Sequence, residues 1–328
     1  MMLSSALFLL LGFVLLVGGG ELLVRGAVRI AERFGLSPML IGLTIVGLGT
    51  SMPELAASVQ AALQGSPGIA VGNIVGSNLA NTLLILGAGA LIAPVLIHRT
   101  VLWRDGLVGL GGVLLLIVAS VTFGLDRIVG SVFLVILAAY LWIAYRQERQ
   151  GAEQTAASSR AAAVEETDGS LRPHEEPTGS FALAVGTFLG GLVLIVAGGV
   201  VLIDAAVAIA SDLGVSDEVI GLTIVAAGTS FPELVTTVVA AVRKQGDIAL
   251  GNVLGSNIFN IFFIGGITGL VAPGPIPASI AAVDLWVLFG ATVAALIFAF
   301  TGGRLGRREG GVLLAAYVAF IASTVASA

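Results

Sequence analysis

Long apolar stretches separated by short polar segments run along almost the whole chain. A helix of about 20 apolar residues is long enough to cross the hydrocarbon core of a bilayer. The pattern therefore predicts an all-α membrane protein with ten transmembrane helices. The predicted spans are 3–23, 38–63, 68–95, 102–121, 126–146, 180–204, 215–241, 247–271, 281–301 and 309–327.

One interval, 147–178, interrupts this pattern. It is rich in Ala, Glu, Ser and Pro and has no hydrophobic periodicity. It is too short and too polar to form a packed domain, so we interpret it as a flexible linker. The linker separates a first five-helix half at 1–146 from a second five-helix half at 179–328.

The two halves carry the same polar motifs in the same order. IGLTIVGLGTSMPEL at 41–55 returns as IGLTIVAAGTSFPEL at 220–234, and GNIVGSNLAN at 72–81 returns as GNVLGSNIFN at 251–260. Both motifs shift by the same number of residues, so 41–81 and 220–260 are two copies of one segment. Because five is an odd number of spans, the second copy enters the membrane from the opposite side. The sequence thus predicts two inverted five-helix repeats.

Composition and charge agree with a membrane protein and give its orientation. The chain is 57% hydrophobic and 11% charged, with mean hydropathy +1.06, whereas soluble domains are about 25% charged. Of the 15 Lys and Arg residues, all except Arg127 follow odd-numbered predicted spans. Under the positive-inside rule the linker is cytoplasmic and both termini lie outside a cell membrane that the chain crosses many times. The chain has no cysteine, which excludes disulfides and thiolate metal sites.

Each copy of the first motif places a glutamate next to a proline at membrane depth. Pro53 and Pro232 have no N–H to donate, so the second and seventh helices are predicted to break there. Backbone carbonyls freed by the break must be satisfied by protein, water or an ion. Ionisable groups in the membrane are costly and mark functional sites, which makes Glu54 and Glu233 the first candidates.

Hydroxyl and amide groups surround both glutamates at helical spacing. They are Thr50, Ser51, Ser77 and Asn81 in the first copy, and Thr229, Ser230, Ser256 and Asn260 in the second. All are hard oxygen donors, which suit Ca²⁺ or Na⁺ and not zinc or copper. Two carboxylates balance one Ca²⁺ or two Na⁺, which is a simple basis for competition between these ions.

Other roles are open for some of these side chains. Ser77 and Ser256 could instead be small residues at helix contacts, and Asn81 and Asn260 could join helices by hydrogen bonds. The remaining asparagines of the motifs are expected to brace the backbone rather than touch an ion. They are Asn73, Asn78, Asn252 and Asn257.

At these motifs the chain resembles the calcium/cation antiporter superfamily, and within it the prokaryotic sodium/calcium exchangers. GTSMPE with GNIVGSNLAN, GTSFPE with GNVLGSNIFN, the ten spans and the linker carry the resemblance. It implies two inverted halves around four adjacent cation sites. The residues that the resemblance implies as ligands are Glu54, Glu233, Thr50, Thr229, Ser77 and Ser256, together with Ser51, Ser230 and Asn81. It also implies that the backbone carbonyls of Gly47 and Ala226 complete the shell. Archaeal and animal exchangers typically carry Asp where this chain has Asn260, so this core holds two carboxylates instead of three.

These features predict a secondary antiporter in which Na⁺ entry drives Ca²⁺ extrusion by alternating access. Exchange of Ca²⁺ for H⁺ or for another cation is the alternative, since a buried glutamate can exchange a proton for a cation. A passive channel fits less well, since channels use rings of charge or carbonyl filters. An intramembrane protease is excluded because neither His98 nor His174 lies in a span and paired Asp residues in spans are absent. We expect no cofactor, no nucleic acid and no obligate protein partner, only inorganic cations and the lipid bilayer.

Overall fold

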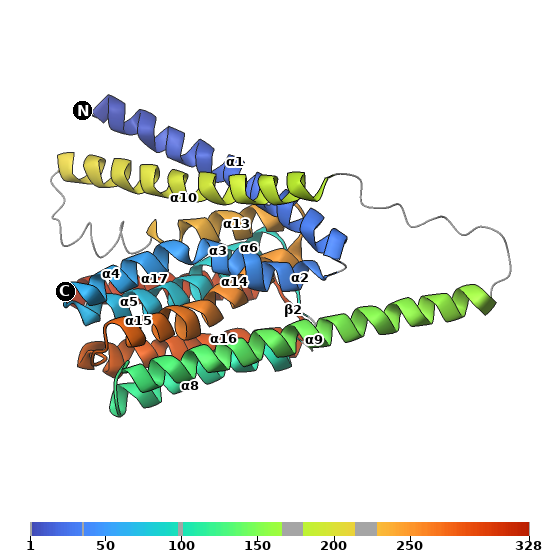
Figure 1. Ribbon diagram of the computed structural model, residues 1–328. Helices are drawn as coiled ribbons and strands as arrows, with labels where there is room; N and C mark the ends of the chain where they lie inside the picture. Colours follow the sequence, from blue (N-terminus) through green and yellow to red (C-terminus); the bar gives the residue numbers. More distant parts are fainter. Residues whose placement is uncertain (1, 35, 98–100, 166–179, 214–227, 328) are drawn as a thin grey trace.

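The computed structural model describes residues 2–34, 36–97, 101–165, 180–213 and 228–327, and this part of the chain is almost entirely helical (Figure 1). The first half contains α1 (Met2–Phe34), α2 (Pro38–Ile41), η1 (Gly42–Val46), α3 (Gly47–Thr50), α4 (Met52–Leu63), α5 (Pro67–Leu79), η2 (Ala80–Ile85), α6 (Leu86–Ile92), β1 (Val95–Leu96), η3 (Leu102–Gly106), α8 (Leu107–Val121) and α9 (Arg127–Glu165). The second half contains α10 (Phe181–Asp212), α13 (Phe231–Val242), α14 (Gly246–Ile258), η5 (Phe259–Ile264), α15 (Gly265–Val271), η6 (Ile280–Asp284), α16 (Leu285–Gly302), β2 (Arg304–Leu305) and α17 (Arg307–Ser327). The η elements are π-helical turns.

Within the described residues, seven helical stretches are long and apolar enough to cross a membrane. Pro38–Thr50 and Met52–Leu63 form an eighth if this pair, bent by 42°, is counted as one span. These helices confirm the prediction of an all-helical membrane protein. The count of ten spans stays a prediction, because part of the seventh span, at 215–241, lies outside the described residues and the tenth, at 309–327, is not among these eight stretches. Its described part is the shorter apolar helix α13.

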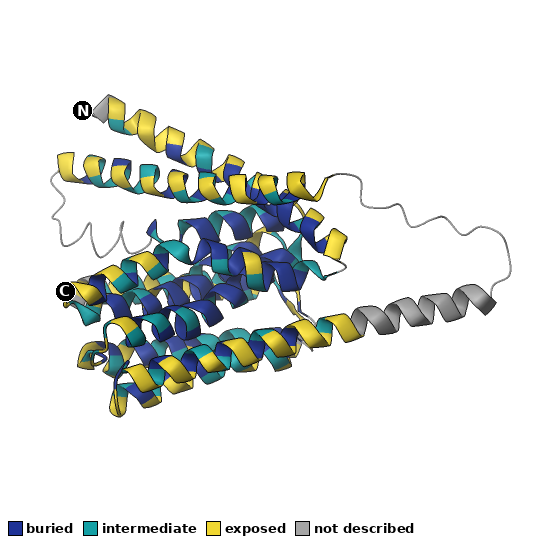
Figure 2. Ribbon diagram, viewed as in Figure 1, coloured by how far each residue is buried: buried dark blue, intermediate teal, exposed yellow. Residues whose placement is uncertain are grey.

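Two continuous helices occupy the centre of the bundle. They are α5–η2–α6 and α14–η5–α15. In each of them 72% of the most apolar 18-residue segment is buried, against 22–33% for the other single helices long enough to span a membrane. Figure 2 shows this arrangement as a buried centre inside outer helices whose outward faces are exposed. Exposed apolar side chains on the outer helices, such as Val121, Ile128 and Val318, form the broad apolar surface expected of a lipid-facing protein.

Both central helices contain a π-helical turn that begins one residue after the GSN sequence. The turns η2 and η5 occupy equivalent positions in the two copies of the motif. A π-helical turn carries an extra residue and is frequent at functional sites. Asn81 and Asn260 are each the second residue of their turn. The motif copies therefore share an irregular backbone as well as a sequence.

The long helices α1 and α10 pack antiparallel along one side of the bundle (Figure 1). A Cβ atom on Gly12 would lie 2.7 Å from the backbone nitrogen of Leu202, and one on Gly26 would lie 2.5 Å from that of Phe188. Small residues are what allow two membrane helices to approach this closely. Glycine is therefore required along this contact by the space available.

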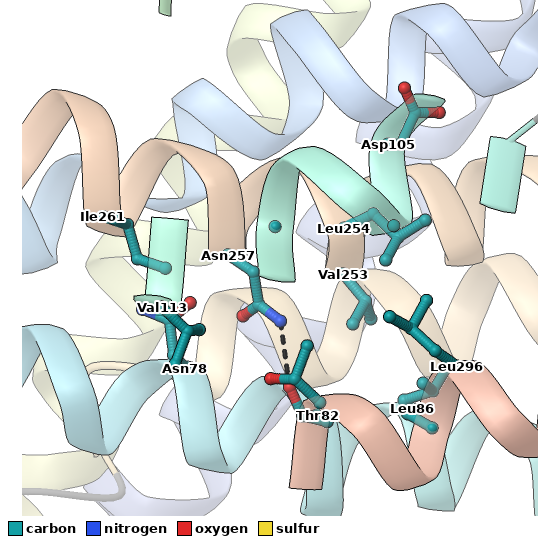
Figure 3. A pocket seen from close by; sticks show the side chains of 14 residues that line it. Asn78, Thr82, Leu86, Asp105, Val113, Val253, Leu254, Asn257, Ile261 and Leu296 are labelled. Carbon is teal, nitrogen blue, oxygen red and sulfur yellow. Dashed lines mark hydrogen bonds between the residues drawn. The ribbon is translucent and has the colours of Figure 1, made fainter. Parts of the chain in front are cut away.

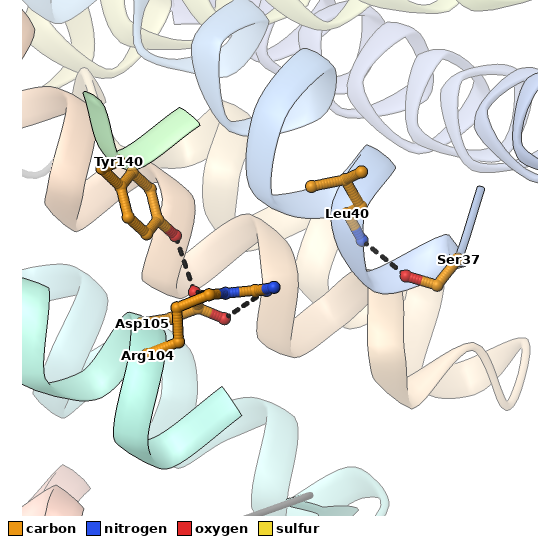
Figure 4. A network of polar contacts seen from close by, with 5 residues as sticks. All are labelled: Ser37, Leu40, Arg104, Asp105 and Tyr140. Carbon is orange, nitrogen blue, oxygen red and sulfur yellow. Dashed lines mark hydrogen bonds and ion pairs between the residues drawn. The ribbon is translucent and has the colours of Figure 1, made fainter. Parts of the chain in front are cut away.

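Polar contacts fix two places near one end of the bundle (Figure 4). Ser37 caps α2, because its Oγ accepts a hydrogen bond from the backbone nitrogen of Leu40 at 3.1 Å. Asp105 on η3 is fully buried and accepts from Arg104 Nε at 2.6 Å and from the Tyr140 hydroxyl at 2.8 Å. The charge of Asp105 is thereby paired, and the network ties η3 to α9. Sequence analysis did not find this network.

Short backbone ladders join connections that are far apart in the sequence. Val95 of β1 pairs with Leu305 of β2 in an antiparallel ladder, and Leu125 forms an isolated antiparallel bridge with Gly274. The first ladder therefore joins the segment after α6 to the segment after α16. The second joins the turn between α8 and α9 to the segment after α15.

The interval 147–178 differs in part from the expected flexible linker. Helix α9 continues through its first part to Glu165. Ala, Glu, Gln and Arg dominate this part and have high helix propensity, so the helix extends beyond its apolar portion. Positions 166–178 lie outside the described residues.

Candidate functional site

The helix that contains the first motif breaks at Ser51. α3 ends at Thr50 and α4 begins at Met52, with Pro53 in its first turn. Ser51 itself adopts φ −85° and ψ 5°, outside the helical region. Because Pro53 has no N–H, the helical ladder cannot run through this point. The predicted break of the second helix is therefore present.

The second motif adopts the same local conformation. Ser230 has φ −89° and ψ 6°, and α13 begins at Phe231 with Pro232 in its first turn. The near-identical dihedral angles follow from the shared sequence. Residues 214–227, which precede this point, lie outside the described residues, so the break of the seventh helix is seen from one side only.

The two glutamates lie in the first turns of α4 and α13 and are completely buried. Each one accepts a hydrogen bond from the serine of the other repeat. Ser51 Oγ donates to Glu233 Oε1 at 3.1 Å, and Ser230 Oγ donates to Glu54 Oε1 at 3.5 Å. The second oxygen, Oε2, of each carboxylate has no hydrogen-bond partner among the described residues. The site therefore contains two carboxylates from opposite repeats, each with one oxygen available.

Thr50 connects the first break to the central helix α14. Its hydroxyl lies 3.2 Å from Asn252 Oδ1 and 3.4 Å from Ser256 Oγ, and 3.3 Å from the carbonyl oxygen of Gly47. One hydroxyl proton can satisfy a single acceptor at a time, so oxygen atoms outnumber protons here. Such a cluster of oxygens is suited to a cation. The backbone of Gly47 approaches Ser256 so closely that a Cβ would lie 3.1 Å from the Ser256 nitrogen.

Asn81 and Asn260 are fully buried, and neither the oxygen nor the nitrogen of either side-chain amide has a hydrogen-bond partner in the described chain. η2 packs against α13, and η5 packs against α4. A buried amide without partners costs about 1–3 kcal/mol for each unsatisfied group. Among the described residues, neither amide makes the interhelical hydrogen bond that is the alternative for these two side chains. Their role as ligands remains a prediction.

The other predicted ligands vary in how well they are placed. Ser77 on α5 is buried, and Thr229 is half-buried just before the break in the second repeat. Ala226 lies outside the described residues. No group of three His, Cys, Asp or Glu side chains capable of holding a metal forms within the described ranges. A cation here would depend on hydroxyl, amide and carbonyl oxygens in addition to the two carboxylates.

Two asparagines hold the breaks in place from the central helices. Asn73 Nδ2 donates to the Glu54 carbonyl oxygen at 3.1 Å and to Ser58 Oγ at 2.9 Å. In the second repeat, Asn252 Nδ2 donates to the Glu233 carbonyl oxygen at 3.2 Å and to Thr237 Oγ1 at 3.0 Å. These contacts confirm that both asparagines brace the backbone.

The sequence analysis missed the acceptors of these bonds, Ser58 and Thr237. The signal that could have found them is their equivalent position in the two repeats, because each follows its glutamate by four residues. Ser and Thr are both hydroxyl residues, so the hydrogen bond survives the change of residue type.

A separate small cavity of about 40 Å³ lies between η2, α8, α14 and α16 (Figure 3). Asn257 Nδ2 donates to Thr82 Oγ1 at 2.9 Å at its edge, and Asn78 Nδ2 donates to the Ile74 carbonyl oxygen at 2.7 Å. Both amides thus contact protein groups, as expected of asparagines with a structural role. This cavity is not formed by the break residues.

Comparison with known proteins identifies the family to which this arrangement belongs. The family model described as "Sodium/calcium exchanger protein" matches residues 4–146 and 183–326. The chain belongs to this family. Its members are ion transporters, so the protein is a multi-pass membrane transporter and not an enzyme.

Individual members of the sodium/calcium exchanger family match over nearly the full chain. "Putative antiporter CaxA" of Alkalimonas amylolytica is 39% identical over 328 residues, covering 97% of this chain and 98% of that protein. "Sodium/calcium exchanger MaX1" of Methanosarcina acetivorans is 37% identical over 346 residues, covering 96% and 97%. A solved structure of the sodium-calcium exchanger NCX_Mj, soaked with Na⁺, superposes with TM-score 0.83 at 31% identity, covering 98% of this chain and 99% of that one.

Proposed function

We propose that the protein is a secondary active antiporter that exchanges Na⁺ for Ca²⁺ across the cell membrane by alternating access. The observation that carries this proposal is the pair of reciprocal bonds from Ser51 to Glu233 and from Ser230 to Glu54. They hold two buried carboxylates at the meeting point of two helix breaks, and one oxygen of each has no hydrogen-bond partner in the described part of the chain. The printed names of the relatives, which include a sodium/calcium exchanger, agree with this proposal.

The chemistry of the buried oxygens supports an alkali or alkaline-earth ion as the transported substrate. Ca²⁺ takes about six to eight oxygen ligands, and Na⁺ also prefers oxygen. The proposed ligands are Glu54, Glu233, Thr50, Thr229, Ser51, Ser230, Ser77, Ser256, Asn81 and Asn260, with the carbonyls of Gly47 and Ala226. Two negative charges can be balanced by one Ca²⁺ or by two Na⁺, so the two ions compete for the same charges.

Matching contacts in the two halves support an inverted-repeat topology of ten spans. The Val95–Leu305 ladder and the Leu125–Gly274 bridge correspond under the repeat to within one residue, because the repeat carries Val95 onto Gly274 and Asp126 onto Leu305. The ladder joins the segments that follow the third and ninth predicted spans. The bridge joins the segments that follow the fourth and eighth predicted spans. Such a pair on opposite faces is what inverted repeats produce.

An asymmetry between the repeats supports alternating access. Gly20 of α1 contacts α13, where its Cβ would lie 3.1 Å from both Val235 and Val239. A cavity of about 570 Å³ remains between α13, α1 and α10. The equivalent face of α4, with Ala56 and Gln60, instead lines an open groove of about 700 Å³. The equivalent helices α4 and α13 thus have different neighbours, which is expected of an inverted-repeat transporter in one of its two end states.

The orientation we propose places both termini outside and the linker in the cytoplasm. Figure 1 places the beginning of α1 and the end of α17 at the same end of the bundle, and α9 extends from the opposite end. The basic residues lie in the connections that follow the odd-numbered predicted spans, and the positive-inside rule places these connections in the cytoplasm. An epitope tag at either terminus should be accessible from outside intact cells, and a tag in the linker should not. Labelling of the linker tag from outside would overturn this orientation.

Transport by purified protein in vesicles tests the coupling ion. We expect Ca²⁺ uptake into proteoliposomes to follow an outward Na⁺ gradient and to stop when that gradient is collapsed. Uptake driven equally well by an imposed proton gradient alone would favour the Ca²⁺/H⁺ alternative. Uptake that needs no counter-ion would indicate a channel. Protein-free vesicles and vesicles with the Glu54→Gln variant are the controls.

A further inference from the structure

A cluster of three charged side chains joins α1 to the end of α13. Arg243 Nε donates to Glu21 Oε2 at 2.7 Å, and Arg243 Nη2 pairs with the other oxygen, Oε1. Glu21 also pairs with Arg25, four residues later on the same helix. The Glu21 side chain is 23% exposed, whereas Arg243 is 51% exposed. A bidentate arginine–carboxylate contact is the strongest geometry for such a pair.

The contact between Glu21 on α1 and Arg243 after α13 lies at an interface that differs between the two repeats. Glu21 and Arg243 line the cavity that α1 and α10 close over α13. On the open side, the residue equivalent to Arg243 is Gln64 at the end of α4, and the residue equivalent to Glu21 is Val200 on α10. An amide and a valine cannot form an ion pair. The other residues of α4 that line the open groove occupy the same repeat positions as the residues of α13 that line the cavity.

We propose that the Glu21–Arg243 pair is an ionic latch that favours the conformation in which α1 lies over α13. This inference rests on the proposed function in one respect, namely that the transporter has a second state in which α10 lies over α4. In that second state the two residues at the corresponding boundary are Val200 and Gln64, so no equivalent ion pair forms. An interaction present in only one of two states shifts the population toward that state.

The size of the bias follows from the exposure of the pair. Ion pairs with solvent access are weak, and the bidentate geometry and the partly covered carboxylate put this one at the upper end of the range. We expect the latch to change the ratio of the two states by roughly two- to five-fold. Arg25 does not contribute to this difference, because its pair with Glu21 lies within α1 and is kept in both states.

Labelling at two equivalent positions can measure this ratio. The chain has no cysteine, so a single introduced cysteine is a clean reporter. Gln60→Cys reports the open face of α4, where Gln60 is exposed, and Val239→Cys reports the face of α13 beneath Gly20. In the purified full chain we expect a maleimide to react faster at position 60 than at position 239.

Removal of the latch should bring the two rates closer together. Arg243→Gln introduces the residue that the other repeat has at this position, and we expect the ratio of the rates to fall two- to five-fold. Arg25→Gln is the matched control and should leave the ratio unchanged. Charge exchange, Glu21→Arg with Arg243→Glu, should restore the parent ratio and shows that the loss is not caused by misfolding.

An unchanged ratio in Arg243→Gln, or an equal fall in Arg25→Gln, would overturn the latch. The labelling reads conformation and requires no ion flux. A protein that fails to exchange Na⁺ for Ca²⁺ but shows the expected ratios would therefore contradict the proposed function and leave the latch standing.

Discussion

Ser51 of the first repeat donates a hydrogen bond to Glu233 of the second, with 3.1 Å between the two oxygens. The serine lies in the break of one helix and the carboxylate in the first turn of another. Ser230 has the corresponding relationship with Glu54. Neither half of the chain therefore completes the cluster alone, and the proposed site forms only where the two repeats meet.

We expect Glu54→Gln and Glu233→Gln each to reduce Ca²⁺ flux to the level of protein-free vesicles while leaving the fold intact. Glutamine keeps the shape and can still accept the serine hydrogen bond, but one carboxylate cannot balance a dehydrated divalent ion. Ca²⁺ uptake into proteoliposomes measures the effect, and Glu32→Gln on the exposed side of α1 is the control. Flux near the parent level in either variant would remove that glutamate from the site.

Asn260→Asp should make transport more dependent on pH than it is in the parent. The substitution adds a third carboxyl group to a buried cluster with two others, and three like charges cannot all ionise at neutral pH without a bound cation. Protons should then compete with the transported ions, so that flux falls as the pH is lowered. A pH profile identical to the parent's, in a variant with the parent's melting temperature, would show that Asn260 does not face the ions.

Asn252→Ala should destabilise the protein by about 1–3 kcal/mol, because it leaves the Glu233 carbonyl and the Thr237 hydroxyl without their buried partner. Asn73→Ala should have a similar effect on the first repeat. Unfolding in SDS measures the change. Asn78→Ala removes a bond within a single helix and is the comparison. Equal losses in all three variants would mean that the contacts to the breaks have no special role.

Gly191→Val should prevent α1 and α10 from packing together. A Cβ at Gly191 would lie 2.3 Å from the backbone nitrogen of Leu23, and backbone atoms at this contact cannot yield without separating the helices. Gly190→Val is the matched control, since a Cβ there has no neighbour within 4 Å. We expect the yield of folded protein, measured by size exclusion, to fall only for Gly191→Val. Normal folding of that variant would show that the contact is not tight.

The sequence by itself determined the class of the protein and predicted the centre of the proposed site. Apolar stretches of membrane length report the solvent around a helix and need no tertiary information, so the all-helical membrane fold could be predicted. Glu54 and Glu233 were predicted as site residues because a charge at membrane depth is costly and this one occurs in both repeats. The breaks at Pro53 and Pro232 follow from the missing N–H, which is a local property of the residue.

Only the tertiary structure decided which groups meet. Local spacing places Ser51 close to Glu54, yet its hydrogen bond goes to Glu233, because the two breaks face each other across the repeats. The pairing of Asp105 with Tyr140, and that of Glu21 with Arg243, likewise joins groups by helix packing that no motif encodes. Periodicity reports what each helix buries, whereas contacts between helices depend on their relative rotation and depth, and these are fixed only when the bundle is assembled.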